Sequence, residues 1–179
     1  MSWKRDSANE RRDMEKVKPW IIGKLRLDNL EEANLQQQRE EDIDLIGTRE
    51  SRTIPIEVKI RHEIYGDFLL ETISNTTTKS KGWIYKSQAE LLIYIIMKKG
   101  HLTGSILIMG GLQRWWKTEG IYRGYPEKLG KTDELYKTRN VAIPWKDIPP
   151  DILIYHNSHN AVNDYFNYHK SGMPNWKEE

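Results

Sequence analysis

Hydrophobic and charged residues alternate with a period of two in segment 53–61, which reads TIPIEVKIR. Alternate side chains of an extended chain share a face, so the aliphatic residues at even positions are expected on one face. Glu57 and Lys59 are then expected on the other face. The alternation and the β-branched residues predict a strand with an apolar side toward a core and a charged side that a core does not require.

Neighbouring segments predict further strands. DIDLIG at 42–47 is typical of a short strand, TRESR at 48–52 of a polar turn, and DFLLETIS at 67–74 of a third strand. Three strands this close in sequence favour an antiparallel meander. We also expect a short buried strand at 104–111 and a late strand at 139–145.

Two helices are expected around these strands. The charged segment 7–25 has a helical pattern, which Pro19 is expected to end or bend. The segment 87–99, SQAELLIYIIMKK, predicts a second helix, because Ser87 and Glu90 have the spacing of a capping box. Apolar residues nearly encircle this segment, so it should be buried against a sheet. LQRWWK at 112–117 is expected to begin another helix.

Composition narrows the class of protein. The 179 residues suit one domain, and 28 Lys and Arg against 26 Asp and Glu leave a formal net charge of only +2. Nucleic-acid binding would therefore need a local basic face. The chain has no cysteine, which excludes disulfides, thiolate zinc sites and thiol catalysis. No secretory signal is visible and the longest apolar run is short, so we expect a cytoplasmic protein without a membrane partner.

Acidic residues are placed where two of the strands would meet. Asp42 and Asp44 share one face of the preceding strand, and if the strands pair through the turn at 48–52, one of these aspartates can converge with Glu57, with Lys59 beside them. Two carboxylates can hold Mg²⁺ or Mn²⁺, and the backbone carbonyl of Val58 is a further candidate ligand. An ammonium group nearby can orient water and stabilise charge on a phosphate. The alternative is a solvent-facing strand that merely alternates acids and bases.

The pair of segments DIDLI and IPIEVKI resembles the core motif of the PD-(D/E)xK nucleases, the restriction-endonuclease-like superfamily. The resemblance implies an α/β fold with an αβββαβ core over about residues 8–110, a mixed sheet flanked by helices, and residues 111–179 packed on it as an extension. It implies that Asp44 and Glu57 bind the metal and that Lys59 assists the attacking water. The literal Pro-Asp pair is missing, because Ile43 precedes Asp44.

The same resemblance suggests further residues. Some members add a glutamate from the first helix, for which Glu10 and Glu15 are candidates, although a surface role is the alternative for both. Some use a glutamine on the helix after the third strand, a place that Gln88 would take. Glu71, in the expected third strand, is a further candidate ligand or substrate contact, with a solvent-facing role as the alternative.

Two segments interleave basic and aromatic residues: KSKGWIYKS at 79–87 and LQRWWKTEGIYRGY at 112–125. Such segments suit phosphate contacts and base stacking, although tryptophans can equally pack inside while the cations face solvent. The expected substrate contacts are Lys81, Lys86, Arg114 and Arg123.

The sequence thus predicts a metal-dependent nuclease that hydrolyses DNA phosphodiester bonds, with RNA as the alternative substrate. A Holliday-junction resolvase of the same fold and a non-catalytic nucleic-acid-binding or assembly protein are the competing interpretations. A homodimer is expected, because cutting two strands needs two sites.

Overall fold

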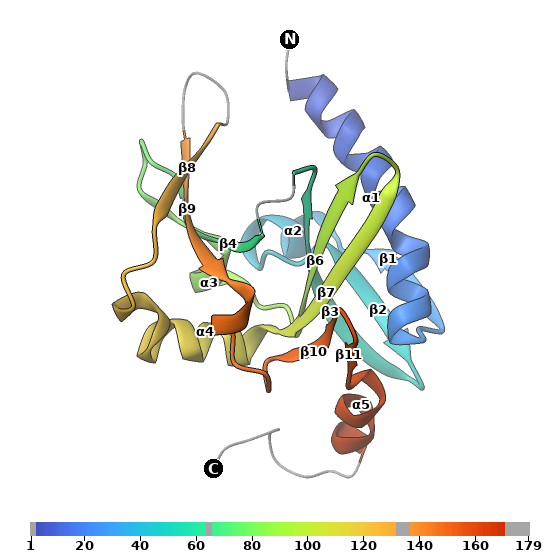
Figure 1. Ribbon diagram of the computed structural model, residues 1–179. Coiled ribbons are helices and arrows are strands. Elements are labelled where there is room, and N and C mark those ends of the chain that lie inside the picture. The colour runs from blue at the N-terminus through green and yellow to red at the C-terminus, as the bar shows by residue number, and fades with distance from the viewer. Residues whose placement is uncertain (1–2, 64–65, 132–136, 171–179) are drawn as a thin grey trace.

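A computed structural model describes residues 3–63, 66–131 and 137–170, which fold into two β-sheets with helices around them (Figure 1). The elements, in chain order, are α1 (Trp3–Leu25), β1 (Asn29–Glu32), α2 (Leu35–Glu40), β2 (Leu45–Arg49), β3 (Arg52–Arg61), β4 (Asp67–Asn75), β5 (Ser80–Lys81), α3 (Trp83–Lys86), β6 (Leu91–Lys98), β7 (His101–Ile108), α4 (Met109–Thr118), η1 (Gly120–Tyr122), β8 (Glu127–Lys131), β9 (Lys137–Pro144), η2 (Trp145–Asp147), β10 (Leu153–His156), β11 (His159–Asn160) and α5 (Val162–Lys170).

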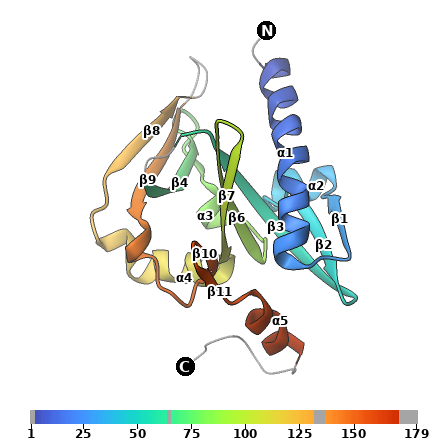
Figure 2. The ribbon, with the colours of Figure 1, turned by 45° about the vertical axis from the view of Figure 1, so that its right-hand side comes forward.

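The larger sheet has seven strands in the order β1-β2-β3-β6-β7-β10-β11, and the smaller one has four in the order β5-β4-β9-β8. Strands β3 and β6 are parallel, whereas the other pairs are antiparallel. Figure 2 shows α1 lying along the seven-stranded sheet, with the smaller sheet on the other side. The predicted α/β class, with a mixed sheet flanked by helices, is confirmed.

The β2–β3 hairpin is formed by local turn chemistry. Glu50 and Ser51 connect the strands and both have positive φ, 51° and 67°. A two-residue turn with positive φ at both positions matches the right-handed twist of a hairpin. It fixes the register in which Leu45 faces Ile56, so that Asp44 comes next to Glu57 at the open end of the hairpin.

One face of β3 packs against α1. Ile54 and Ile56 are fully buried there with Val17 and Ile21 of the helix, which lie four residues apart on one helical face. On β7, a side chain at Gly104 would collide with the Trp20 ring of α1. The absence of a side chain at that position therefore lets the helix lie close to the sheet.

The predicted helix at 87–99 is wrong, because residues 91–98 of this segment form strand β6 and the residues before them form a loop. Its apolar residues face two cores: Leu91, Ile93 and Ile95 pack toward α1, and Leu92 and Tyr94 pack toward the smaller sheet. A strand buried on both faces is apolar all round, as a buried helix is, so the pattern alone did not separate the two.

The expected capping box is also absent. The Ser87 hydroxyl donates to the carbonyl of Asp42 (3.1 Å) and accepts from the N–H of Ala89 (3.3 Å). The Glu90 carboxylate pairs instead with Arg52, at 2.7 Å. Both side chains thus fasten the start of β6 to neighbouring segments rather than cap a helix.

The predicted meander is correct only in its first two strands. Segment 67–74 lies within a strand, β4, but β4 belongs to the smaller sheet and pairs with β9 and β5. The strand that completes the antiparallel meander is β1, which precedes β2 and pairs with it. The polar sequence NLEE of β1 lacks the alternation by which a strand is predicted.

Helix α1 continues through Pro19 to Leu25, contrary to the expected end or bend at the proline. Pro19 is exposed, whereas Val17, Ile21 and Leu25 are fully buried. Packing of this apolar face offsets the hydrogen bond that the proline removes from the helix.

Residues after 110 contribute to both sheets. Strand β9 pairs with β4, and β10 pairs with β7 at the far side of the larger sheet. The expected strand at 139–145 corresponds to β9, and the expected helix at 112–117 to α4.

Among the described residues, none of the helices has the length and apolar character needed to cross a membrane.

Candidate active site

Asp44 directly precedes β2, at the point where the pairing between β2 and β3 ends. Its backbone N–H donates to the carbonyl of Ile56 (2.9 Å), and its Oδ2 accepts a hydrogen bond from the N–H of Val58 (2.8 Å). The β2–β3 ladder ends at the Leu45–Ile56 pair. The side chain of Asp44 therefore continues the hydrogen bonding that a further strand residue would otherwise supply.

Glu57 and Lys59 form a buried ion pair on the face of β3 opposite α1. Glu57 Oε1 contacts Lys59 Nζ, and only 2% of the Glu57 side chain and 28% of the Lys59 side chain are exposed. The Lys59 ammonium also lies 6.0 Å from the ring centre of Trp83, on α3. On the charged side of the predicted strand, Glu57 is thus buried in the protein, while Lys59 stays partly exposed.

Burial and mutual charge shift the pKa values of these groups. Burial raises the pKa of Glu57 to about 8, against the opposing attraction of Lys59 and with a further contribution from Asp44. Burial likewise raises the pKa of Asp44, opposed by Lys59 and by the hydrogen bond from Val58. For Lys59, burial acts against the ammonium, but Glu57 and Asp44 outweigh it and raise its pKa to about 12. Lys59 is therefore a fixed cation near neutral pH.

The oxygen atoms at this place have the character of ligands for a hard divalent cation. Glu57 Oε2 is buried and has no hydrogen-bond partner among the described residues. The N–H and C=O of one strand residue point to the same side, so the Val58 carbonyl lies on the side where Asp44 bonds the Val58 N–H. No group of three or more His, Asp or Glu side chains suited to a metal ion occurs in the described part of the chain. Two carboxylates and one carbonyl would leave the other positions of an octahedral ion to water and substrate.

A cavity of about 600 Å³ opens beside these residues, between α1 and β3. Asp44, Val58 and Lys59 line it together with Asn9, Asp13, Met14, Ile60 and His62. The cavity gives Asp44, Val58 and Lys59 access to a molecule from solvent, whereas Glu57 is not among the residues that line it.

The carboxylate that α1 adds to this cavity is Asp13. Its Oδ2 lies 3.0 Å from Nε2 of His62, which follows β3. Glu15 pairs with Lys18 at 2.6 Å and does not line the cavity, and the side chain of Glu10 lies outside the described residues. Sequence reasoning missed Asp13, because the helix phase that turns it toward His62 is set by the packing of Val17 and Ile21.

Two further acids affect the pKa values within the Lys59 cluster, which consists of Asp44, Glu57 and Lys59. Glu71, on β4, contributes to the raised pKa of Lys59, and Asp42 to that of Glu57. Burial raises the pKa of Glu71 itself, opposed by Lys59. A side chain at Gly82 would collide with the Glu71 backbone, so the glycine before α3 lets Trp83 and Glu71 lie together. Glu71 is thus half-buried beside Lys59, and its role as a ligand or substrate contact stays a prediction.

The expected substrate contacts lie at scattered positions. Gln88 is exposed in the loop after α3, not on a helix, because the segment that it was expected to begin is a strand. Lys81 and Arg114 are exposed on β5 and α4. Lys86 pairs with Asp42 at 2.9 Å, so Lys86 lies at the edge of the Lys59 cluster. Arg123 pairs with Glu119, the residue that follows α4.

No model of a known protein family matches this chain, and no curated protein resembles it significantly. The chemistry of the site is therefore inferred from its own geometry.

Proposed function

We propose that this protein is a metal-dependent nuclease that hydrolyses phosphodiester bonds of DNA. One observation carries the proposal: a permanently charged lysine, Lys59, is held against the buried carboxylate of Glu57 at the wall of an open cavity that Asp44 also lines. Burying such a pair is expensive, and replacing it with apolar residues is often neutral or stabilising, so a core alone gives no reason for it.

The residues that would hold Mg²⁺ or Mn²⁺ are Asp44, Glu57 and the Val58 carbonyl. When bound, the ion would polarise a phosphate oxygen and lower the pKa of a bound water. Its positive charge would also favour the ionised form of Glu57, whose pKa burial raises to about 8. The unpartnered Oε2 of Glu57 would gain a partner at the same time.

Lys59 would act through its charge. With a pKa of about 12 it remains an ammonium group at neutral pH and is a poor proton acceptor. It can donate hydrogen bonds to a phosphate oxygen as negative charge develops there, and it can orient the attacking water. The pairing with Glu57 limits its motion, so that the charge is already in place when the substrate binds.

The order of elements is compatible with the resemblance to PD-(D/E)xK nucleases. Helix α1, strands β1, β2 and β3, the short helix α3 and strand β6 follow one another along the chain, with α2, β4 and β5 inserted. A Holliday-junction resolvase of this fold remains the second candidate. A homodimer and a cytoplasmic location belong to the same proposal, and light scattering with and without DNA would test the former.

The test is a cleavage assay with plasmid, linear, single-stranded and four-way-junction DNA, and with single-stranded RNA, each with and without Mg²⁺ or Mn²⁺. The wild type should cut at least one substrate only with the divalent ion. Lys59→Ala should be slower by about a hundredfold to a thousandfold. Lys98→Ala is the matched control, since Lys98 is an exposed lysine at the end of β6.

Binding of DNA without any cleavage would contradict the nuclease proposal and favour the non-catalytic nucleic-acid-binding alternative. Equal rates for Lys59→Ala and the wild type would move the active site elsewhere. Preference for the four-way junction over all linear forms would favour the resolvase.

A further inference from the structure

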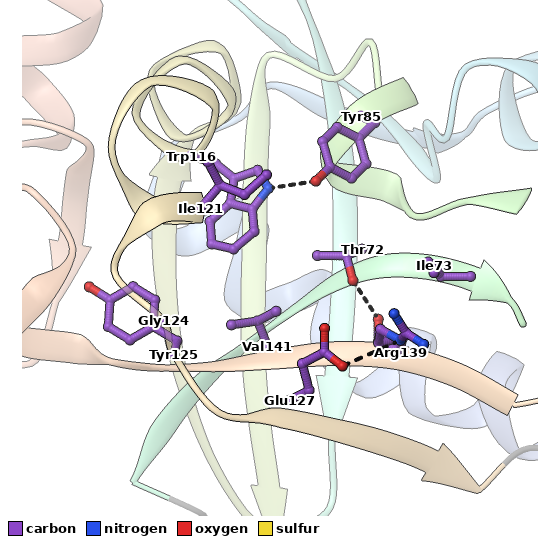
Figure 3. Close-up of a pocket in the computed structure, with 10 residues that line it drawn as sticks. All are labelled: Thr72, Ile73, Tyr85, Trp116, Ile121, Gly124, Tyr125, Glu127, Arg139 and Val141. Atoms are coloured by element: carbon purple, nitrogen blue, oxygen red, sulfur yellow. Dashed lines mark hydrogen bonds and ion pairs between the residues drawn. The ribbon is translucent and has the colours of Figure 1, made fainter. Parts of the chain in front are cut away.

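A second hollow, on the smaller sheet, is built differently from the cavity beside Lys59. It has a volume of about 420 Å³, which lies in the range of small-molecule sites. Figure 3 shows residues from α3, α4, η1 and strands β4, β8 and β9 around it. Three of them are aromatic: Tyr85, Trp116 and Tyr125.

The aromatic wall is held by a defined contact. Trp116 Nε1 donates to the hydroxyl of Tyr85 at 2.9 Å, which joins α4 to α3. Trp116 is buried in the core, whereas Tyr125 is partly exposed at the mouth. Ile121 lines the same hollow and is 46% exposed, so it adds apolar surface beside the aromatic residues.

A polar pair completes the hollow. Glu127 on β8 and Arg139 on β9 lie 3.5 Å apart, and both side chains line the space (Figure 3). Thr72 contributes a hydroxyl that is bonded to the Arg139 carbonyl at 3.2 Å. The hollow thus offers flat aromatic surface together with one carboxylate acceptor and one guanidinium donor.

We propose that this hollow binds one unpaired base of a single-stranded nucleic acid. A base has a flat face that stacks on aromatic side chains and an edge that carries both donors and acceptors. Tyr125 matches the face, with Trp116 packed behind the wall of the hollow, and Glu127 and Arg139 match the edge. An aliphatic side chain of a protein partner would use the aromatic surface but would leave the charged pair without a function.

The carboxylate of Glu127 also predicts which bases bind best. A carboxylate accepts hydrogen bonds from an exocyclic amine, which adenine, cytosine and guanine have and thymine lacks. Oligonucleotides of thymine alone should therefore bind more weakly than oligonucleotides of adenine or cytosine.

The choice of a nucleic acid as ligand rests on the proposed function, but base binding does not require cleavage. The hollow and the Lys59 cluster are joined through shared elements. On β4, Glu71 belongs to the cluster and Thr72 lines the hollow. On α3, Trp83 contacts Lys59 and Tyr85 lines the hollow. The two sites are therefore linked along β4 and α3, and consecutive strand residues such as Glu71 and Thr72 point to opposite faces of β4.

The experiment measures binding of short fluorescent single-stranded oligonucleotides by anisotropy, in full-length protein that carries Lys59→Ala so that the probe is not cut. Tyr125→Ala should weaken binding roughly tenfold, the loss expected for one stacked base. Tyr125→Phe should bind nearly as well as the parent, because the ring face is kept. The matched control is Tyr122→Ala, since Tyr122 is 81% exposed nearby and does not line the hollow.

Glu127→Gln should reduce the preference for adenine and cytosine over thymine while leaving binding of thymine oligonucleotides unchanged. The inference is overturned if Tyr125→Ala and Tyr122→Ala weaken binding equally, if a blunt duplex binds as tightly as single strands, or if the parent binds no oligonucleotide. Loss of binding in Tyr125→Ala combined with a wild type that never cleaves would support the base site and contradict the nuclease. Cleavage with no effect of Tyr125→Ala would do the reverse.

Discussion

Two neighbouring lysine–carboxylate pairs, Lys59–Glu57 and Lys86–Asp42, differ in how deeply they are buried. Lys59 pairs with Glu57, whose side chain is 2% exposed, whereas Lys86 pairs with Asp42, whose side chain is 16% exposed. Lys59 comes from the middle of the seven-stranded sheet, and Lys86 from the end of the short helix α3. The backbone of the first pair is held by its pairing with β6, whereas the second pair is more exposed to solvent.

The difference in burial predicts a difference in electrostatic strength between the two pairs. A buried charge interacts strongly with its neighbours and changes their pKa values, while solvent screens an exposed one. Burial raises the pKa of Glu57 to about 8, whereas Lys86 contacts a carboxylate that water can also reach. We therefore expect that changes to the Lys59–Glu57 pair affect both activity and stability, and that changes to the Lys86–Asp42 pair affect neither by much.

The largest expected effect is on metal binding. Glu57→Gln and Asp44→Asn should each abolish cleavage and weaken Mg²⁺ or Mn²⁺ binding by tenfold or more, as estimated for loss of a ligating group. Titration calorimetry with the ion alone measures this directly. The asparagine and glutamine side chains keep the shape of the originals, so that loss of charge is what is tested.

Asp42→Asn is the matched control for metal binding. Asp42 Oδ2 is buried without a hydrogen-bond partner among the described residues, as Glu57 Oε2 is, but Asp42 does not line the cavity beside Lys59. Its φ of 48° lies in the left-handed region, which asparagine also tolerates. Affinity lost in Asp42→Asn but kept in Asp44→Asn would exchange the two ligand assignments.

The sequence predicted the hairpin of this region better than the elements that surround it. The alternation around Glu57 and Lys59 and the turn at 48–52 are local features, so the hairpin and its acidic end could be read directly. The strand at 91–98 could not, because its apolar residues serve two cores that only the tertiary structure defines. Asp13 and Glu71 reach the site from α1 and β4, and no local pattern specifies such long-range contacts.

The next largest effect is on stability. Lys59→Met leaves Glu57 buried without its partner and should lower the free energy of unfolding by roughly 3 kcal/mol, as is typical for breaking a buried pair. The double variant Glu57→Met/Lys59→Met should recover most of that loss, since both faces of β3 would then be apolar. Urea denaturation of the two single variants and the double variant measures the coupling. Additive losses in the double variant would mean that the pair contributes no interaction of its own.

A pH dependence of stability should follow from Glu57 in the absence of divalent ions. Because its folded pKa, about 8, lies above the ordinary glutamate pKa of 4.5, the folded state keeps a proton that the unfolded state releases. Stability should therefore be greatest below about pH 4.5, as far as this group is concerned, and fall as pH rises toward 8. The fall is on the order of a few kcal/mol, at about 1.4 kcal/mol for each pKa unit.

Chemical denaturation at pH 5, 6.5 and 8 tests this dependence, with the ion removed by a chelator. Glu57→Gln should lose the part of the decrease that comes from this group, and saturating Mg²⁺ should offset the decrease in the wild type by binding the ionised form. A wild type and Glu57→Gln with parallel pH profiles would show that the carboxylate of Glu57 ionises normally in the folded protein.

The smallest effect is expected for the exposed pair. Lys86→Ala removes the 2.9 Å contact with Asp42, but the Lys86 side chain is 38% exposed, and such pairs contribute at most about 1 kcal/mol. Urea denaturation of Lys86→Ala should therefore give a stability close to that of the wild type, and the small difference should shrink further at 1 M salt, where the Debye length is about 3 Å. Lys59→Met should keep most of its destabilisation at high salt, because buried charges are screened less. If 1 M salt reduced the destabilisation of Lys59→Met and of Lys86→Ala equally, the two pairs would be solvated in the same way. The difference between them, on which the proposed site depends, would then disappear.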